Sequence, residues 1–359
     1  MRQTGETTCT FSRATGAAGL AVLLCLAPLA GCASSPGALF DPANTQHRWP
    51  PAPDQPRIQY VGELRGQADL HAGRSGLQRI GEALFGADPA EVFVSPIAVC
   101  TDGADRVFIA DSNAQAVHVL DLRTRAYRKF ASKEPQPRLA QPVALAWDPA
   151  GRLLVSDALG AEIVIFDAAG GRTGAIGTGI LKRPCGLAID PATHQVFVAD
   201  TGAHQIVVFD KDGRELSRIG RRGSGPGEFN YPTYVTLDAS GRLYVSDSLN
   251  FRVQIFSPNL EALRQIGRKG DMPGYFSQPK GIAIDPDGHL LVVDANFEAV
   301  QIFNAEGRLL MSFGHEGQAP GEFWLPAGIF VDPTGRIWIA DSYNRRVQIF
   351  DRVDEGKQP

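Results

Sequence analysis

The chain has no excess of positive charge, and it has few cysteines. Its 359 residues include 35 Lys and Arg against 39 Asp and Glu, which gives a formal net charge of −4. This balance lacks the basic surface that nucleic-acid binding requires, so no nucleic-acid partner is expected. Disorder of the whole chain is excluded as well, because 43% of the residues are hydrophobic and 21% are charged.

The chain also lacks an apolar run of full membrane-spanning length near its start. Residues 17–30 are apolar, which is shorter than the roughly 20 residues that a spanning helix needs. Because this run follows Arg2 and Arg13 and ends in small residues, it has the layout of a secretory signal. Residues 29–32 at the end of this run, Leu-Ala-Gly-Cys, resemble the bacterial lipobox, whose cysteine becomes the lipidated N-terminus. We therefore expect a signal peptide over 1–31 and lipid on Cys32, the alternative being a plain signal peptide with an incidental cysteine.

The mature chain is acidic and poor in cysteine. Removal of residues 1–31 leaves 33 basic and 38 acidic side chains, a net charge of −5. Cys9 and Cys25 leave with the signal and Cys32 takes the lipid, so only Cys100 and Cys185 remain. Two cysteines do not make a disulfide framework. Residues 32–56 are rich in Pro, Ala and Ser, a composition that predicts an extended, unpaired tether.

A repeat of about 47 residues follows the tether. Six stretches align under prolines that are separated by 46, 42, 48, 47 and 47 residues: Pro96, Pro142, Pro184, Pro232, Pro279 and Pro326. Each unit has an apolar run after the proline, a turn, a second apolar run that ends in Asp, a third run such as VQIF, and a fourth. The six aspartates are Asp111, Asp157, Asp200, Asp247, Asp294 and Asp341. Four short β-branched runs per unit, repeated radially, predict the blades of a propeller.

The segments PKGIAIDPDGHLLVVD, DSYNRRVQIFD and GSGPGEF resemble the NHL repeat family. The resemblance covers about residues 57–351 and implies an all-β, six-bladed β-propeller. Cys100 and Cys185 would lie in the first strands of blades one and three, with a blade between them. We therefore expect two free thiols, because this separation exceeds the roughly 7 Å limit for a disulfide.

The sixth unit ends after its third strand, and residues 352–359 are expected to form a tail. The segment IQYVGEL at Ile58–Leu64 resembles the fourth-strand segment ELSRIG, so we expect it to pair with Val347–Phe350 and close the ring. Residues 66–95 make a long connection between this strand and the first blade. Leu77, Ile80 and Leu84 lie on one helical face within it, which predicts a short amphipathic helix.

No residue pattern predicts a catalytic, metal or cofactor site. The six aspartates at the strand ends are interpreted as structural, since a carboxylate there can accept N–H bonds from a turn. Amidating lyases of this propeller type use a zinc bound by three histidines, but only His204 and His315 fall in the loops of one face, on opposite sides of the ring. The channel positions lack the Glu, Asn and Asp that hold calcium in gluconolactonase-type propellers, and no serine lies in a recognisable nucleophile turn.

Basic and aromatic residues gather in the loops that follow the second strands and precede the first strands, a surface that we call the top face. The turns after the first and third strands, the bottom face, are acidic. This asymmetry predicts a top-face surface for an anionic partner. Its expected residues are Arg183, Arg222, Tyr231, Tyr234, Phe251, Arg252, Lys280, Tyr343, Arg345 and Arg346. Tyr234 replaces the Ala or Gly of the other five units, so its ring is expected to close the channel or to present a hydroxyl to a ligand.

The sequence as a whole predicts a membrane-anchored, non-catalytic binding scaffold in the cell envelope. Its expected partners are a protein, a peptide or an anionic envelope component, together with the membrane through the lipid on Cys32. Because Ala33 and not Asp follows the cysteine, we expect the outer membrane, with the propeller facing the periplasm. The alternative is a propeller lyase or hydrolase, of the amidating-lyase or gluconolactonase type, with a metal at the channel mouth.

Overall fold

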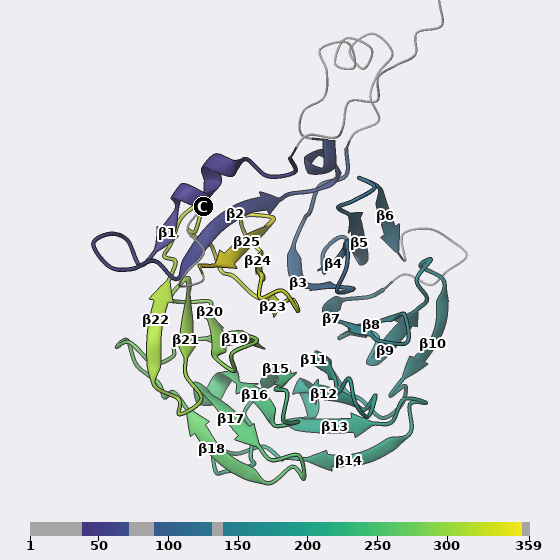
Figure 1. Cartoon of the computed structure of the whole chain (residues 1–359). Coiled ribbons are helices and arrows are strands. Elements are labelled where there is room, and N and C mark those ends of the chain that lie inside the picture. The colour runs from purple at the N-terminus through teal and green to yellow at the C-terminus, as the bar shows by residue number, and fades with distance from the viewer. Residues whose placement is uncertain (1–37, 72–89, 131–138, 354–359) are drawn as a thin grey trace, which may run out of the picture. The chain divides into compact units, whose positions relative to one another are not determined.

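The structure of the protein is a computed structural model that describes residues 38–71, 90–130 and 139–353. These residues belong to one compact unit, residues 36–359. Their strands form five four-stranded sheets and one five-stranded sheet, arranged as blades around a central channel (Figure 1). The predicted all-β, six-bladed β-propeller is confirmed. Within the described residues, no helix is long and apolar enough to span a membrane.

The first three blades follow the chain order from the channel outward. Blade one contains β3 (Pro96–Thr101), β4 (Arg106–Asp111), β5 (Ala116–Asp121) and β6 (Tyr127–Phe130). Blade two contains β7 (Pro142–Asp148), β8 (Arg152–Asp157), β9 (Glu162–Phe166) and β10 (Arg172–Ile176). Blade three contains β11 (Pro184–Ile189), β12 (Val196–Asp200), β13 (Gln205–Phe209) and β14 (Glu215–Ile219).

The last three blades have the same antiparallel order. Blade four contains β15 (Pro232–Leu237), β16 (Leu243–Asp247), β17 (Arg252–Phe256) and β18 (Ala262–Ile266). Blade five contains β19 (Pro279–Ile284), β20 (Leu290–Asp294), β21 (Ala299–Phe303) and β22 (Leu309–Phe313). Blade six contains β23 (Ile329–Val331), β24 (Ile337–Asp341) and β25 (Arg346–Arg352), followed outward by two strands from the N-terminal side of the chain.

The ring closes as the sequence predicts. Strand β2 (Ile58–Leu64) pairs antiparallel with β25, with Leu64 opposite Val347 and Tyr60 opposite Phe350. The pairing extends beyond the predicted end of β25 to Arg352, which lies opposite Ile58. A sheet completed by strands from both ends of the chain leaves no open edge at the junction of the ring.

The expectation of an unpaired tether over residues 32–56 is wrong for residues 42–49, whereas residues 50–56 lie in no strand and are mostly exposed. A 3-10 helix, η1 (Pro42–Gln46), leads into β1 (Arg48–Trp49), which pairs with β2 and adds a fifth strand to blade six. The Trp49 ring packs against Phe313 and Phe350, with ring centroids 5.9 Å away in both cases. Proline-rich composition predicts solvation, but an aromatic side chain placed beside two buried rings gains more from contact.

The long connection after β2 is only partly described. A second 3-10 helix, η2 (Gln67–His71), follows β2, and Leu70 is buried in the cluster that joins blades six and one. Gly66 forms an isolated bridge with Val92 near the start of blade one. The predicted amphipathic helix at residues 77–84 lies outside the described residues.

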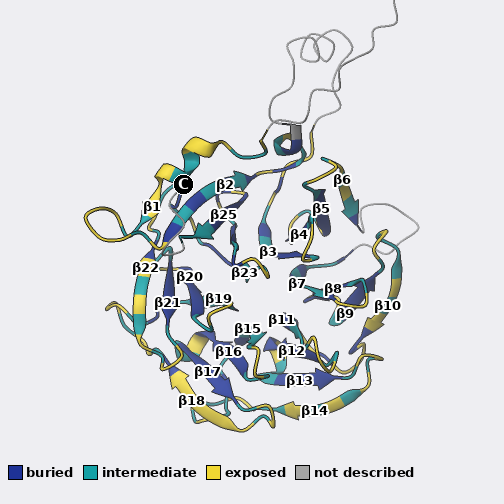
Figure 2. Cartoon of the chain, in the orientation of Figure 1, coloured by how far each residue is buried: buried dark blue, intermediate teal, exposed yellow. Residues whose placement is uncertain are grey.

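The hydrophobic core lies between neighbouring blades. Six clusters of buried side chains each join two adjacent sheets, so both faces of the inner strands are covered. Figure 2 shows this gradient, with buried residues on the inner strands and exposed residues on the outer strands β14, β18 and β22. Burial on both faces accounts for the nearly continuous apolarity of the second and third strands of each unit.

Candidate functional site: the top face and the central channel

The six strand-end aspartates hold the top-face loops in place. The carboxylate of Asp111 accepts N–H bonds from Val94 and Ser95, at 2.6 and 2.9 Å, and Asp294 accepts the corresponding bonds from Ser277 and Gln278. All six aspartates are buried. A buried carboxylate is stable when it accepts several N–H bonds, so the structural interpretation of these residues is confirmed.

A hydroxyl after four of these aspartates joins one blade to the next, a feature that the sequence analysis missed. Ser112 donates to the carbonyl of Pro142 at 2.7 Å, and Ser342 donates to the carbonyl of Pro96 at 2.6 Å across the closure of the ring. Thr201 and Ser248 form the same bond with Pro232 and Pro279. The repeat contains the signal, since Ser or Thr follows Asp in four of the six units. The bonds fix the angle between blades, because each is satisfied away from water.

Two of the predicted binding residues, Arg252 and Arg346, are not on the surface. Their side chains are 5% and 1% exposed and extend along the interior of blades four and six. Arg252 pairs with Asp247 at 2.9 Å, and Arg346 pairs with Asp341 at 2.7 Å. Arg346 also donates to Glu63 of β2 and to the carbonyls of Gln318, Ala319 and Glu322. Their prediction as top-face ligands is wrong, because these five-donor groups satisfy buried acceptors of the loops.

Five of the predicted residues are exposed on the top face. The aromatic rings are Tyr231, which is 42% exposed and packs edge-on to His204, and Tyr343, which is 60% exposed and packs on Trp324. Arg183, Arg222 and Arg345 are exposed and form no ion pair with the described part of the chain. The top face therefore offers free guanidinium groups and accessible aromatic rings together.

Phe251 and Lys280 contribute less to this surface. The Phe251 ring is half-buried, with the ammonium of Lys269 5.2 Å from its centroid, which is a cation–π distance. Lys280 is half-buried near the start of β19. Burial lowers the pKa of the Lys280 ammonium, and the nearby charge of Asp294 partly opposes that shift.

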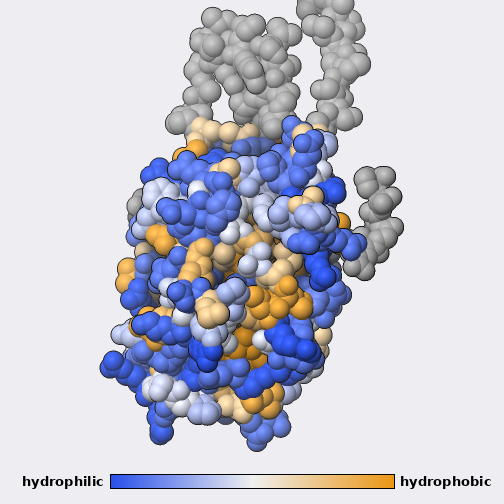
Figure 3. Space-filling view, turned by 90° about the vertical axis from the view of Figure 1, so that its left-hand side faces the viewer, coloured by the Kyte–Doolittle hydropathy of each residue, from blue (hydrophilic) through white to orange (hydrophobic). Residues whose placement is uncertain are grey.

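Exposed apolar side chains are concentrated on the top face. Twelve large hydrophobic residues of the described chain are exposed, and nine of them lie in top-face loops. The nine are Val92, Val94, Leu159, Ile180, Tyr231, Leu249, Met272, Trp324 and Tyr343. The other three, Leu216, Leu263 and Leu310, lie on the outer strands of blades three, four and five. Figure 3 views the ring from the side of β1 and β22, where an apolar area is bordered by hydrophilic residues.

The bottom face is less acidic than its sequence predicts. Asp238 pairs with Arg242 at 2.6 Å, and Asp148 pairs with Arg152 four residues later in the same turn. These aspartates also accept backbone N–H bonds of their own turns, as Asp238 does from Ser240 at 2.9 Å. The carboxylates of Asp148 and Asp238 are thereby neutralised within their own turns, so the expected contrast between an acidic bottom and a basic top is reduced at these two positions.

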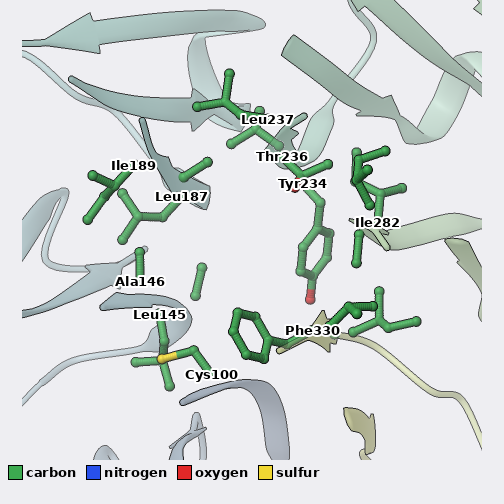
Figure 4. A pocket seen from close by; sticks show the side chains of 18 of the residues that line it. Cys100, Leu145, Ala146, Leu187, Ile189, Tyr234, Thr236, Leu237, Ile282 and Phe330 are labelled. Atoms are coloured by element: carbon green, nitrogen blue, oxygen red, sulfur yellow. The ribbon is translucent and has the colours of Figure 1, made fainter. Parts of the chain in front are cut away.

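Tyr234 lies in the central channel and not on the top-face surface. Its ring projects from β15 into a pocket beside Phe330 (Figure 4), and its hydroxyl donates to the carbonyl of Ile97 at 3.3 Å. Ile97 belongs to blade one, which is opposite blade four in the ring. Gly328 of blade six approaches the same carbonyl closely, since a Cβ on Gly328 would lie 2.5 Å from it. The bond across the channel supports the interpretation that Tyr234 closes it.

The described residues place the histidines apart. Nδ1 of His204 accepts a hydrogen bond from the backbone N–H of Tyr231 at 3.2 Å. His315 lies in the loop between β22 and β23, where its Nε2 is 3.3 Å from Oε1 of Glu322. One group with metal-type spacing occurs in the described residues, formed by Asp285, Asp287 and His289 in a bottom turn of blade five. Both of its carboxylates already pair with Arg352. This group lies at the opposite end of the strands from the top-face loops.

The fold and these loops define the protein as a six-bladed β-propeller with a closed ring. Residues 188–243 match a family model described as a 6-bladed beta-propeller, and residues 276–303 and 323–350 match the NHL repeat. The chain is therefore a six-bladed propeller in which two segments match the NHL repeat. It is 26% identical over 144 residues to NHL repeat-containing protein 2 of Gallus gallus, an alignment that covers 32% of this chain and spans only 20% of the chicken protein.

Solved structures with the same architecture have different functions. The virginiamycin B lyase of Staphylococcus aureus is 15% identical and superimposes with a TM-score of 0.53, over 74% of this chain and 86% of the lyase. An auxiliary nutrient binding protein of Bacteroides ovatus is 13% identical with a TM-score of 0.58, over 73% of this chain and 70% of that protein. At such identities the likeness shows the fold alone.

Proposed function

We propose that the protein is a non-catalytic binding scaffold whose top face captures an acidic protein or peptide with apolar side chains. The observation that carries this proposal is the concentration of exposed apolar side chains in the top-face loops. The nine residues come from loops of all six blades, and their unequal distribution between the two faces favours an interaction on the top face. The binding protein of Bacteroides ovatus shows that this architecture is used for binding in at least one other protein.

We infer the sign of the partner's charge from the top-face cations that form no ion pair with the described residues, because they outnumber the top-face carboxylates without one, Asp271, Glu298 and Glu316. Arg183, Arg222 and Arg345 extend into solvent between the apolar residues, and a negative partner would gain from each of them. Aromatic rings flank these charges, and Tyr, Trp and Arg are the residues enriched in the energetically important parts of protein interfaces. The cations would steer and orient the partner, and the apolar groups would supply most of the buried area.

A lipid anchor on Cys32 is part of the same proposal. Cys32 lies outside the described residues, and the proposal rests on the apolar run 17–30 and the Leu-Ala-Gly-Cys junction. A diacylglycerol would hold the propeller at the cell envelope, at the outer membrane with Ala33 after the cysteine. The partner would then be another component of the envelope.

The alternative, a propeller lyase or hydrolase, requires a metal at the channel mouth of the top face. The lyase of Staphylococcus aureus shows that the architecture can support such an activity. In the described part of this chain, however, the group with metal-type spacing is in a bottom turn and is paired with Arg352. This geometry favours the binding scaffold. Elemental analysis after dialysis separates the two, since the enzymatic alternative requires a stoichiometric metal.

Photo-crosslinking at defined positions tests the proposed surface. A photoreactive phenylalanine analogue at Tyr343 should crosslink to a discrete protein in intact cells, whereas the same analogue at Ser240, in a bottom turn, should not. The combined replacement of Arg222 and Arg345 by Glu should reduce the Tyr343 crosslink at least fivefold. Equal crosslinking from both faces, or none from Tyr343, would show that the top face is not the binding surface.

A further inference from the structure

We propose a second binding site, in which the central channel holds one small, uncharged apolar molecule that enters from the bottom face. The site lies at the opposite end of the strands from the top-face loops, so it goes beyond the proposed scaffold function. Its evidence is the shape of the channel, the chemistry of its wall, the closure by Tyr234 and the charge balance of the rim.

The channel contains a cavity of about 350 Å³ that opens toward the bottom face. All six inner strands line it, from β3, β7, β11, β15, β19 and β23. A wider hollow lined by residues of the bottom turns continues from it and shares Trp147, Ile189, Leu237 and Phe330 with the cavity. None of the prolines that begin the inner strands at the top lines the cavity. The space is therefore a funnel with one open end.

The side chains that line the funnel are mostly apolar, and Tyr234, Thr236 and Asp238 add polar groups to its wall. Leu145, Leu187 and Ile282 line it from three blades (Figure 4) as members of the buried clusters between blades, and Phe330 and Trp147 add aromatic surface. A cavity of this size is at the small end of the range for ligand pockets, about 300–1,000 Å³. Apolar walls of an unfilled cavity lose dispersion contacts, and apolar cavities bind small apolar molecules in preference to water.

The closed end of the funnel supplies hydrogen-bonding groups. The Tyr234 hydroxyl uses its proton toward the carbonyl of Ile97, so its oxygen lone pairs remain able to accept a bond. Thr236, from the same strand, also lines the cavity. A ligand with one hydroxyl or amine donor on an otherwise apolar body would match this arrangement, its donor facing Tyr234 and its body filling the funnel.

The rim of the funnel selects against charge. Four prolines line the bottom hollow, at positions 149, 191, 286 and 333. The carboxylate of Asp238 at this rim is paired with Arg242, and those of Asp285 and Asp287 are paired with Arg352. Asp285 and Asp287 share one arginine, and Asp332 of the same hollow forms no ion pair with the described residues, so the rim has an excess of carboxylates. These carboxylates repel an anion, and a cation would lose its hydration on passing from the rim to the mostly apolar wall. The compatible ligand is therefore uncharged.

The test is a calorimetric titration of the full chain carrying Cys32→Ser, with 2-naphthol as the donor-bearing probe and naphthalene as the probe without a donor. We expect saturable binding of 2-naphthol with one site per chain. Ala146→Trp fills the funnel from β7 and should weaken binding at least tenfold. Ala188→Leu fills it from β11 with a smaller side chain, and it decides the test if the first variant does not fold. Tyr234→Phe should weaken the binding of 2-naphthol about threefold or more and leave the affinity for naphthalene unchanged.

Leu216→Ala, on the outer strand of blade three, is the control and should bind both probes as the parent does. Binding of 2-naphthol that is not saturable, or that both filling variants retain at full affinity, would overturn the proposal. The top-face proposal fails separately, because crosslinking from Tyr343 does not depend on the funnel.

Discussion

Arg345 and Arg346 are adjacent in the chain, yet one guanidinium is exposed on the top face and the other is 1% exposed inside blade six. The reason is local backbone geometry, since Arg345 has a left-handed conformation with φ of 54° at the entry to β25. The turn directs Arg345 outward and leaves Arg346 as the first residue of the strand, beside Asp341. The same arrangement occurs in blade four, where Phe251 has φ of 55° and precedes the buried Arg252.

This pair gives a matched prediction. Arg346→Ala should lower the free energy of unfolding by about 3 kcal/mol or more, because it leaves the buried Asp341 without its cation. Arg345→Ala should change it by less than about 0.5 kcal/mol, as expected for an exposed side chain, but should weaken the Tyr343 crosslink. Urea denaturation of both variants measures the difference. Equal midpoints would show that the Arg346–Asp341 pair does not stabilise the blade.

Ring closure predicts the result of two N-terminal truncations. A chain that starts at Gly66 lacks β2, so it exposes the edge of β25 and should aggregate. A chain that starts at Arg57 keeps β2 but lacks β1 and Trp49, and it should stay monomeric with a lower melting temperature. Light scattering and thermal denaturation distinguish them. If the Gly66 chain were monomeric at the parent's melting temperature, β2 would not be needed for the ring.

Both remaining thiols should be free and slow to react. Cys100 is buried in β3 and Cys185 lies in β11, with blade two between them. Burial raises the pKa of both thiols, which keeps them in the protonated form that reacts poorly with disulfide reagents. In a form that starts at Ala33, we expect two thiols after denaturation, and the Cys100 thiol should react in the native state far more slowly than in the unfolded chain. A count of zero would contradict the blade order.

The protein should lose stability at alkaline pH. Burial raises the pKa values of the Cys100 thiol and of the Tyr60, Tyr127 and Tyr234 phenols above their ordinary values. The folded state therefore keeps these protons where the unfolded chain releases them, above about pH 8.5 for a thiol and pH 10 for a phenol. Stability from these groups is complete below those values and falls as the pH rises.

Urea midpoints at pH 8 and pH 10.5 measure this loss, and Tyr234→Phe should show a smaller decrease than the parent. The variant lacks one of the groups with a raised pKa, so an identical decrease would mean that Tyr234 ionises equally in both states.

Cys32→Ser tests the proposed lipid anchor. The parent should remain with the membrane fraction after a high-salt wash, because two acyl chains hold a protein stably where one does not. The Ser variant should be released into the soluble fraction. Retention of the Ser variant after that wash would mean that Cys32 does not carry the anchor.

The sequence by itself determined the number of blades, the order of the strands and the closure of the ring by Ile58–Leu64. These features follow from local signals, namely the proline and Asp positions, the Asp-containing turns and the β-branched runs, which recur in every unit. The Asp-x4-Arg spacing of Asp247 with Arg252, and of Asp341 with Arg346, was also present and could have revealed the buried pairs.

Only the tertiary structure decided which of the candidate residues reach the surface. The depth of Arg346 depends on loop carbonyls of its blade and on Glu63 of β2, none of which the linear spacing brings together. The position of Tyr234 depends on the carbonyl of Ile97 in the opposite blade, and the funnel that it closes is formed by six strands at once. The packing of Trp49 on Phe313 and Phe350 could not be predicted from the sequence for the same reason. A local pattern specifies an element, whereas exposure and cavity shape depend on neighbours that are distant in the chain.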